Sequence, residues 1–268
     1  MDMRKVLACA SVFAPVFLAG AAGAADLPTH KAPPPIAPPP AFTWAGGYAG
    51  SNIGVGFIDG QADPACINPA GVSLGVGCAI APQLKLSAAG FLAGAQSGYN
   101  WQFNSIVLGF EDDIQGAGLQ KSSSTTGTFP QTGGTFTALG TITAKERLNY
   151  FGTVRGRLGY AFDRLLVYAT GGLIYGDVNL SYSRLFPAVS FVGSDDSLRF
   201  GGTIGGGFEY AFSDRWSAKV EGLYYSFGSK TLLSTALPAP NGFQTGFKFR
   251  EDGELVRVGL NYRFGSLW

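Results

Sequence analysis

The sequence holds a single histidine, His30, as its one candidate for a catalytic base of the usual kind. Histidine acts as general base near neutral pH, commonly within reach of a serine or an aspartate. His30 directly precedes the proline-rich run 31–40, which is a semi-extended spacer with no core of its own. A Ser-His or Asp-His pair therefore cannot form in the rest of the chain, and we predict no catalytic residues and no enzyme.

Cofactor chemistry also has few candidates. Haemin needs an axial ligand. Because both methionines lie at the extreme N-terminus, the surface candidates are Tyr182 or a reduced Cys66 or Cys78. The glycine-rich run 201–207 resembles a phosphate loop only superficially, since no helix follows it, and glycine there relieves crowding on a curved strand. We expect no cofactor and no metal, with haemin as the alternative ligand.

Nine charged residues could form ion pairs, because they share one parity within segments of alternating polar and apolar residues. They are Glu111, Asp113, Arg155, Arg157, Glu209, Lys219, Glu221, Arg257 and Arg263. Alternate residues of a strand point to the same face of a sheet, so this spacing predicts a charged face. With four acids and five bases, the face is nearly balanced.

The last thirteen residues, 256–268, indicate what kind of element carries such a face. Their apolar parity consists of Val256, Val258, Leu260, Tyr262, Phe264 and Trp268, interrupted by Ser266. The other parity holds Arg257, Gly259, Asn261 and Arg263. A strand that ends in aromatic residues suits an outer face in lipid and an inner face in a polar lumen.

Other segments alternate in the same way and predict eight strands in all. These are expected at 44–57, 89–102, 106–116, 148–162, 165–176, 199–212, 216–228 and 249–264. Tight turns at 103–105, 163–164 and 213–215 alternate with long loops at 58–88, 117–147, 177–198 and 229–248. Short turns on one rim and long loops on the other are typical of outer-membrane barrels. We therefore predict an all-β fold, an eight-stranded antiparallel up-and-down transmembrane β-barrel over residues 42–268 with both termini in the periplasm.

Aromatic residues gather beside the short turns and indicate a membrane interface. They are Trp101, Tyr160, Phe162, Tyr210, Phe212, Trp216, Tyr262 and Phe264. Such a girdle is typical of outer-membrane barrels, whereas a soluble β-barrel, the alternative, has no need of an aromatic ring on one rim. Asp112 breaks the pattern, since it shares the outward parity of Phe110 and Ile114. Either it lies near the long-loop rim or a bulge re-aims it.

The width of the barrel decides what the nine charged residues do. The interior of an eight-stranded barrel is only wide enough for side chains to fill. Opposite charges there should pair, because an unpaired buried charge costs several kcal/mol. We predict an ion-pair network that fills the lumen and stiffens the barrel; a conduction pathway is the alternative.

The N-terminus predicts export. Arg4 and Lys5 precede an apolar run that ends in small residues at 22–25, which is the pattern of a cleaved signal peptide over 1–25. A transmembrane helix is the alternative, and Pro15 disfavours it. Cleavage between Ala24 and Asp26 leaves a proline-rich periplasmic spacer at 26–41.

Cleavage also removes Arg4, Lys5 and Asp2, so the mature chain carries 17 basic and 17 acidic residues. Without a basic surplus, no nucleic-acid partner is expected. Cys66 and Cys78 are the two cysteines that remain, and exported chains tend to form disulfides. We predict a Cys66–Cys78 disulfide in the first external loop; a metal pair is the lesser alternative, since no histidine lies nearby.

Several motifs resemble one known family, the small OmpA-like outer-membrane proteins of alphaproteobacteria, also described as porin-family or RopB-like. The motifs are Ala25-Asp26-Leu27-Pro28, Trp44-Ala45-Gly46-Gly47-Tyr48, Gly94-Ala95-Gln96-Ser97-Gly98-Tyr99-Asn100-Trp101, Gly152-Thr153-Val154-Arg155-Gly156-Arg157-Leu158-Gly159-Tyr160 and Trp216-Ser217-Ala218-Lys219-Val220-Glu221. The resemblance covers the signal peptide and residues 42–264. It implies location in the cell outer membrane, no catalytic residues, and roles in envelope integrity and surface exposure. For some members it also implies haemin binding or passage of small solutes.

The C-terminal strand resembles the family's assembly signal, which is read by the barrel-assembly machinery. The residues concerned are Val256, Val258, Leu260, Tyr262, Phe264 and Trp268. This chain differs in carrying four residues beyond Phe264. We expect a structural and surface protein in contact with outer-membrane lipid and lipopolysaccharide. A narrow porin or a surface haemin-binding protein is the alternative, and the sequence does not predict an oligomeric state.

Overall fold

The computed structural model describes residues 42–67, 83–130, 137–187, 190–237 and 244–265. These form eight strands: β1 (Gly46–Ile67), β2 (Leu84–Phe103), β3 (Ile106–Pro130), β4 (Thr137–Phe162), β5 (Leu165–Leu185), β6 (Ser190–Ala211), β7 (Trp216–Leu237) and β8 (Gln244–Gly265). Within these ranges no helix is long and apolar enough to cross a membrane. The signal peptide and spacer expected at 1–41 lie outside the described residues.

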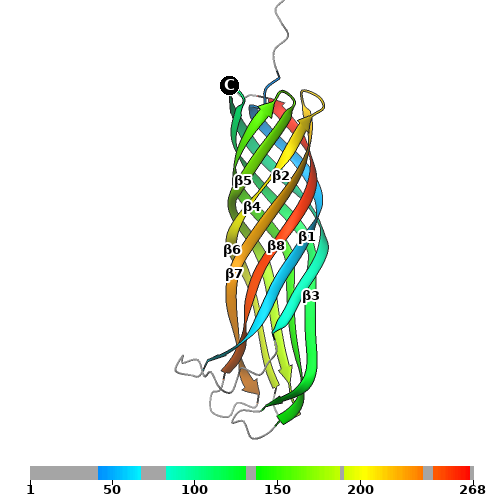
Figure 1. Ribbon diagram of the computed structural model, residues 1–268, viewed down its shortest axis with the longest axis vertical. Coiled ribbons are helices and arrows are strands. Elements are labelled where there is room, and N and C mark those ends of the chain that lie inside the picture. Colours follow the sequence, from blue (N-terminus) through cyan, green and yellow to red (C-terminus); the bar gives the residue numbers. More distant parts are fainter. Residues whose placement is uncertain (1–41, 68–82, 131–136, 188–189, 238–243, 266–268) are drawn as a thin grey trace, which may run out of the picture. The chain divides into compact units, whose positions relative to one another are not determined.

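The eight strands close into one antiparallel barrel, in which each strand pairs with the next and β1 pairs with β8 (Figure 1). Short turns join β2 to β3, β4 to β5 and β6 to β7 at one rim. Asn104 and Asp163 have φ values of 55° and 52° in two of these turns, and both residue types tolerate this left-handed conformation. The predicted eight-stranded up-and-down fold is confirmed.

The strands are much longer than the sequence patterns predicted. The ranges expected to be long loops are largely strand: β3 continues to Pro130, and β4 begins at Thr137. The prediction ended each strand where its outward apolar residues ended. Beyond that level the strands continue with Ser and Thr outside and apolar residues inside, and the β-branched Thr side chain still favours extended structure.

The half of the barrel next to the short turns carries an apolar outer surface, which we call the lipid-facing belt. At the rim of short turns its exposed side chains include Trp101, Phe103, Tyr160, Phe162, Tyr210, Phe212, Trp216 and Phe264. Its opposite edge is marked by Phe57, Phe91, Tyr150, Phe200 and Tyr224. This is the pattern of a barrel surface that meets hydrocarbon between two aromatic girdles.

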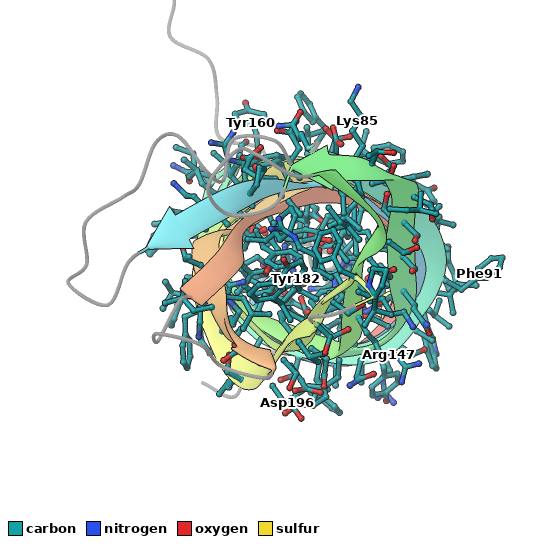
Figure 2. All side chains as sticks on the ribbon, turned by 90° about the horizontal axis from the view of Figure 1, so that it is seen from below. Lys85, Phe91, Arg147, Tyr160, Tyr182 and Asp196 are labelled. Carbon is teal, nitrogen blue, oxygen red and sulfur yellow. The ribbon has the colours of Figure 1, made fainter. Side chains whose placement is uncertain are left out.

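Beyond the belt lies the outer half of the barrel, where the polarity of the two faces is reversed. Its outward side chains include Asp59, Lys85, Arg147, Asp196 and Arg250. Its interior is an apolar core that includes Leu84, Leu86, Leu119, Ile142, Leu180, Tyr182, Phe247 and Phe249. Figure 2 shows Tyr182 within the ring of strands, and Lys85, Arg147 and Asp196 outside it.

Two seams in the outer half lack the backbone ladder. β2 and β3 pair between Leu92–Phe103 and Ile106–Ala117, but 84–91 of β2 does not pair with 118–130 of β3. β6 and β7 pair regularly from Gly202 to Ala211, and again at Ser190 and Phe191, but not over 192–201. Side chains cross the gap between β6 and β7 instead. We call this unpaired stretch the β6–β7 seam.

Two contacts bridge the β6–β7 seam. Lys230 Nζ lies 3.1 Å from a carboxylate oxygen of Asp195, and Arg199 donates a 3.4 Å hydrogen bond to the carbonyl oxygen of Phe227. A positive φ of 76° at Gly228, beside a register shift in the pairing of β7 with β8, bends β7 at this point.

Candidate functional site

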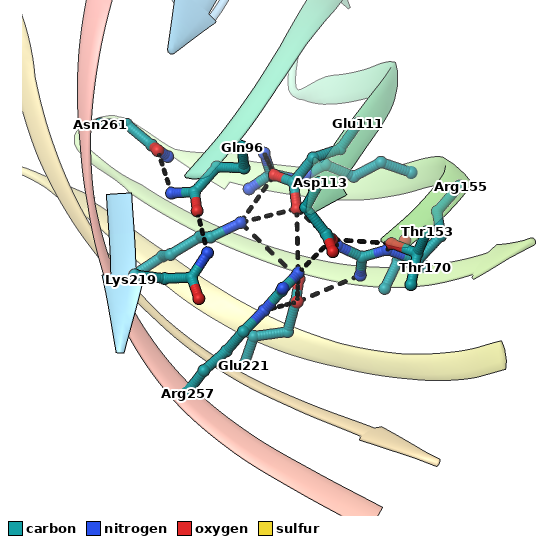
Figure 3. Close-up of polar contacts among 12 residues, drawn as sticks. Gln96, Glu111, Asp113, Thr153, Arg155, Thr170, Lys219, Glu221, Arg257 and Asn261 are labelled. Atoms are coloured by element: carbon teal, nitrogen blue, oxygen red, sulfur yellow. Dashed lines mark hydrogen bonds and ion pairs between the residues drawn. The ribbon is translucent and has the colours of Figure 1, made fainter. Parts of the chain in front are cut away.

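The centre of the membrane-level lumen is Glu111, which points inward from β3 and is buried. Lys219 Nζ lies 2.7 Å from each of its carboxylate oxygens, and Arg155 Nη2 lies 2.6 Å from Oε1. The Tyr48 hydroxyl donates a further hydrogen bond of 2.9 Å. Arg257 on β8 donates a longer hydrogen bond of 3.4 Å to Oε1. Four strands besides β3 thus supply donors to one carboxylate, as Figure 3 shows for Lys219 and Arg155.

A second group of contacts surrounds Arg257 on β8. Its Nη2 lies 2.6 Å from Glu221 Oε1 and 2.8 Å from Asp113 Oδ2 (Figure 3). Arg155 reaches the same two carboxylates at 3.1 and 2.9 Å, and Thr153 donates a 2.7 Å hydrogen bond to Asp113. Each arginine therefore bridges carboxylates from two strands.

A third group lies closer to the short turns. Arg157 pairs with Glu209, and its guanidinium lies 3.8 Å from the ring centroid of Tyr168, close enough for a cation–π contact. Asn261 donates a 2.9 Å hydrogen bond to Glu209, and the Tyr168 hydroxyl donates one to Glu221. Neutral polar side chains thus complete the hydrogen bonding of carboxylates that the cations do not saturate.

These contacts join eight of the nine charged residues into what we call the lumen network. Its members are Glu111, Asp113, Arg155, Arg157, Glu209, Lys219, Glu221 and Arg257, and all are buried. Four acids face four bases, so the network is neutral overall. Removing one partner of such a buried pair typically costs about 3–5 kcal/mol, because the other charge remains buried and uncompensated.

Arg263, the ninth residue, is placed differently from the expectation that it faces the carboxylates. It makes no ion pair with any residue that the structure describes. Instead it donates a hydrogen bond to the backbone oxygen of Thr43, and its guanidinium lies 4.7 Å from the Phe42 ring and 5.1 Å from the Trp44 ring. β8 reaches the rim of short turns at this residue, beyond the level of the carboxylates, so Arg263 belongs to a cap over the mouth of the barrel at that rim.

A second buried charge cluster was missed by the sequence analysis. Lys121 Nζ lies 3.5 Å from Glu146 Oε2, and Arg199 pairs with Glu251, all inside the outer half. Lys121 and Glu146 fall in the range 117–147, which was expected to be a loop. Their alternation with apolar neighbours was the signal that could have placed them on inward faces.

An apolar layer separates the two charge clusters. Its side chains lie between them along the strands and include Leu119, Leu148, Phe151, Leu223 and Leu255. Phe151 stacks on Tyr225 with the ring centroids 6.3 Å apart. The lumen therefore alternates between charged and apolar levels.

Asp112 faces outward, on the lipid side of the barrel. It pairs regularly with Ser97 on β2 and Val154 on β4, so the alternative that a bulge re-aims it is wrong. The alternative of a place near the long-loop rim is also wrong, because β3 continues to Pro130. The Ser97 hydroxyl donates a 2.7 Å hydrogen bond to its carboxylate. This neighbour offsets part of the desolvation of a charge on an apolar surface.

The proposed haemin ligand Tyr182 is also placed differently from expectation. It lies in strand β5 rather than in a loop, and only 1% of its surface is exposed. Its ring packs against Phe247 with the centroids 4.5 Å apart. Tyr182 is therefore a core residue of the outer half and is not available at the surface as an axial ligand.

The cysteine prediction cannot be followed to its side chains. The backbone of Cys66 pairs with Thr245 at the end of β1, whereas its side chain and Cys78 lie outside the described residues. The disulfide stays a prediction, and labelling of free thiols in unfolded, unreduced protein tests it. Within the described part of the chain, no group of three or more His, Cys, Asp or Glu residues could hold a metal ion.

The C-terminal residues expected to signal assembly face outward on β8, where it closes the barrel against β1. Val256, Val258, Leu260 and Phe264 are exposed in the lipid-facing belt. Tyr262 packs 5.1 Å from Trp216, measured between ring centroids. Trp268 lies outside the described residues.

Comparison with known proteins agrees with this geometry. The model of the outer membrane protein β-barrel domain family matches residues 13–264, and the chain belongs to this family. It is therefore an outer-membrane β-barrel protein, as the sequence predicted.

Its relatives come from alphaproteobacteria. The 31 kDa outer-membrane immunogenic protein of Brucella melitensis is 35% identical over 265 residues, which cover 98% of this chain and all of that protein. The 22 kDa outer membrane protein of Rhizobium leguminosarum is 30% identical over 65% of this chain and 67% of its own length. Among solved structures, OprG of Pseudomonas aeruginosa has a TM-score of 0.47 at 12% identity, covering 82% of this chain and 97% of that one.

Proposed function

We propose that this protein is a structural barrel of the outer membrane that contributes to envelope integrity and conducts no solute through its lumen. The observation that carries the proposal is the filling of the lumen, where side chains occupy the interior of the ring (Figure 2). The eight members of the lumen network are buried and paired with one another, so none lines an open aqueous path.

Two further features support a closed lumen. At the periplasmic mouth, Trp44 is buried and its indole N–H donates a 2.9 Å hydrogen bond to the carbonyl oxygen of Asp163. In the outer half, the rings of Phe247 and Phe249 are fully buried in the apolar core. A hydrated ion would have to displace side chains at each of these levels, and it would have to separate paired charges at low dielectric.

Planar-bilayer recording on refolded protein tests the proposal. We expect no stepwise conductance from protein whose folding has been verified by heat-modifiable migration, with a general porin in the same bilayer as the positive control. A steady unitary conductance would instead establish the alternative, a narrow porin for small solutes.

The structural role has its own test in the cell. Loss of the gene should raise sensitivity to detergents and large antibiotics, and the full chain should restore resistance. A chain ending before Val256 should not, because an open sheet edge is not tolerated in lipid. If gene loss left the sensitivity to detergents and large antibiotics unchanged, the proposed structural role would be wrong.

We propose three further properties from the same features. The outward face of β8 is read by the barrel-assembly machinery, exposed residues just beyond the belt such as Lys85 and Arg250 contact lipopolysaccharide, and the chain has no catalytic activity. Lys85 and Arg250 support the second property because each is exposed on an outward face above the apolar belt, at the level where lipid headgroups begin.

A further inference from the structure

A shallow, open groove of about 640 Å³ lies in the lipid-facing belt across β2 to β6. The side chains around it are almost entirely apolar, and the polar residues Arg157 and Thr170 at its edge point into the lumen, where both are buried. Its outward lining includes Trp101, Leu108, Leu158, Ala169, Gly171 and Ile204.

The strand register places large side chains around a floor of glycine. Leu108 pairs with Trp101 on one side and with Leu158 on the other, which makes a continuous wall across three strands. One row further from the short turns, Gly156 pairs with Gly171. Gly171 in turn pairs with Ile204, which is 65% exposed and forms the opposite wall.

Packing within the barrel does not require glycine at the floor. A Cβ atom on Gly156 would have its nearest neighbour at 3.9 Å, and one on Gly171 at 3.5 Å, which are ordinary contact distances. By contrast, a Cβ on Gly172 would overlap the carbonyl oxygen of Val154, and one on Gly205 that of Gly222. Glycine is obligatory at these inward positions, whereas at the floor of the groove it leaves a space that a side chain could fill.

We propose that this groove binds one acyl chain of a phospholipid from the periplasmic leaflet. The groove is continuous with the surface that the barrel presents to lipid, so its occupant comes from the hydrocarbon phase. Its apolar walls offer contact along a chain and nothing to a headgroup. It lies on the short-turn side of the belt, since Leu158 is four residues from Phe162 at that rim, and the periplasmic leaflet covers this side.

Electron spin resonance of a spin-labelled lipid tests the proposal. The full-length protein is refolded in vesicles of phosphatidylethanolamine and phosphatidylglycerol that contain phosphatidylethanolamine with a nitroxide on its acyl chain. We expect one slowly exchanging, immobilised lipid per barrel beyond the ordinary boundary population. Gly156→Leu, which fills the floor, should abolish this component.

Gly222→Leu is the matched control. Gly222 also faces lipid, a Cβ there would have its nearest neighbour at 4.0 Å, and it lies outside the groove. This variant should retain the immobilised lipid. If Gly156→Leu does not fold, Ile204→Ala removes one wall without adding bulk and should increase the rate of lipid exchange at least severalfold.

Three results would overturn the proposal. The first is a wild-type spectrum that matches Gly156→Leu. The second is an equal loss of the component in Gly222→Leu. The third is occupation by a different molecule, seen as immobilised lipopolysaccharide in asymmetric vesicles or as cross-linking between two copies of Leu158→Cys.

Discussion

The two halves of this barrel are built from the same eight strands, but the polarity of their inner and outer faces is opposite. In the half next to the short turns, apolar side chains face outward and the lumen network fills the interior. In the outer half, charged side chains face outward and Phe247, Phe249 and their neighbours fill the interior. The strands cross this boundary without ending, so strand continuity does not depend on which face is apolar. It depends on alternation itself and on the solvent that each face meets.

The halves also differ in what a lost side chain leaves behind. Truncation in the membrane half leaves a charge without its partner in a space that excludes water. Truncation in the outer half leaves a cavity among apolar groups, as in a soluble protein. This difference predicts which substitutions disturb the whole barrel and which disturb one half.

The largest effect is expected for Arg257→Ala in the lumen network. Its removal leaves Glu221 and Asp113 short of a partner, so the free energy of unfolding should fall by about 3–5 kcal/mol. The measurement is the midpoint of urea unfolding in lipid vesicles. Arg250→Ala is the control on the same strand, since Arg250 is exposed and faces outward, and its effect should stay within about 0.5 kcal/mol. Equal midpoints for the two variants would contradict the role of the lumen network.

Leu86→Ala in the outer half should have the next largest effect. Leu86 is 1% exposed in the apolar core, and truncation of a buried leucine costs about 2–5 kcal/mol. We expect the outer half to become sensitive to added protease while the membrane half stays resistant within the vesicle. Leu139→Ala, at an exposed outward position of the same half, should leave the protease resistance of both halves unchanged. Loss of the whole barrel in Leu86→Ala would mean that the halves unfold as one unit.

A smaller effect is expected at the β6–β7 seam. Amides of residues 192–201 that point toward β7 have no ladder partner, so they should exchange with deuterium faster than amides of 178–184. That segment of β5 lies in the same half and pairs regularly with both β4 and β6. Hydrogen-exchange mass spectrometry measures this directly. Equal protection in the two segments would show that the ladder between β6 and β7 is closed in solution.

The smallest effect is expected when pH is changed and hydrogen exchange is measured at the β6–β7 seam. The hydrogen bond from Ser197 lowers the pKa of Asp195, which lies beyond the lipid-facing belt, and Lys230 adds to the effect. A lowered folded-state pKa stabilises at pH values above the ordinary aspartate range and loses its effect only as pH falls through the lowered value. The rate of hydrogen exchange at residues 192–201, corrected for the intrinsic exchange rates, should therefore be unchanged from neutral pH down to about pH 5. A rise within this interval would show that the Asp195–Lys230 pair does not hold the seam.

Sequence patterns sufficed for the membrane half because one rule applies along each strand there. The alternation from Val256 to Phe264 predicted both the outward face and the inward position of Arg257. The same rule did not foresee Arg263 at the mouth, because parity gives the face of a residue but not its height along the barrel axis. Height depends on the tilt and register of eight strands, which no single segment encodes.

The strands of the outer half could not be predicted from the sequence for a different physical reason. Its strands alternate with the reverse polarity, and a search for outward apolar residues ends where that polarity changes. Leu119 and Lys121 are buried there, whereas Gln120 and Ser122 are exposed. The alternation was therefore present, but its apolar residues marked the inward face instead of the outward one. The β6–β7 seam had no sequence signal at all, because pairing between two strands is a property of their separation.

The length of the strands beyond the belt determines the surface that another cell or an antibody would meet. β4 continues for thirteen residues from the belt edge at Tyr150 to Thr137, which at about 3.3 Å per residue and the usual tilt corresponds to a rise of roughly 30 Å above the lipid. Along this wall only every second side chain of a strand is on display, and its lateral neighbours come from different parts of the chain. A binder of the wall must therefore recognise an epitope that is discontinuous in sequence, and linear peptides cut from these strands should be poor substitutes for the folded surface.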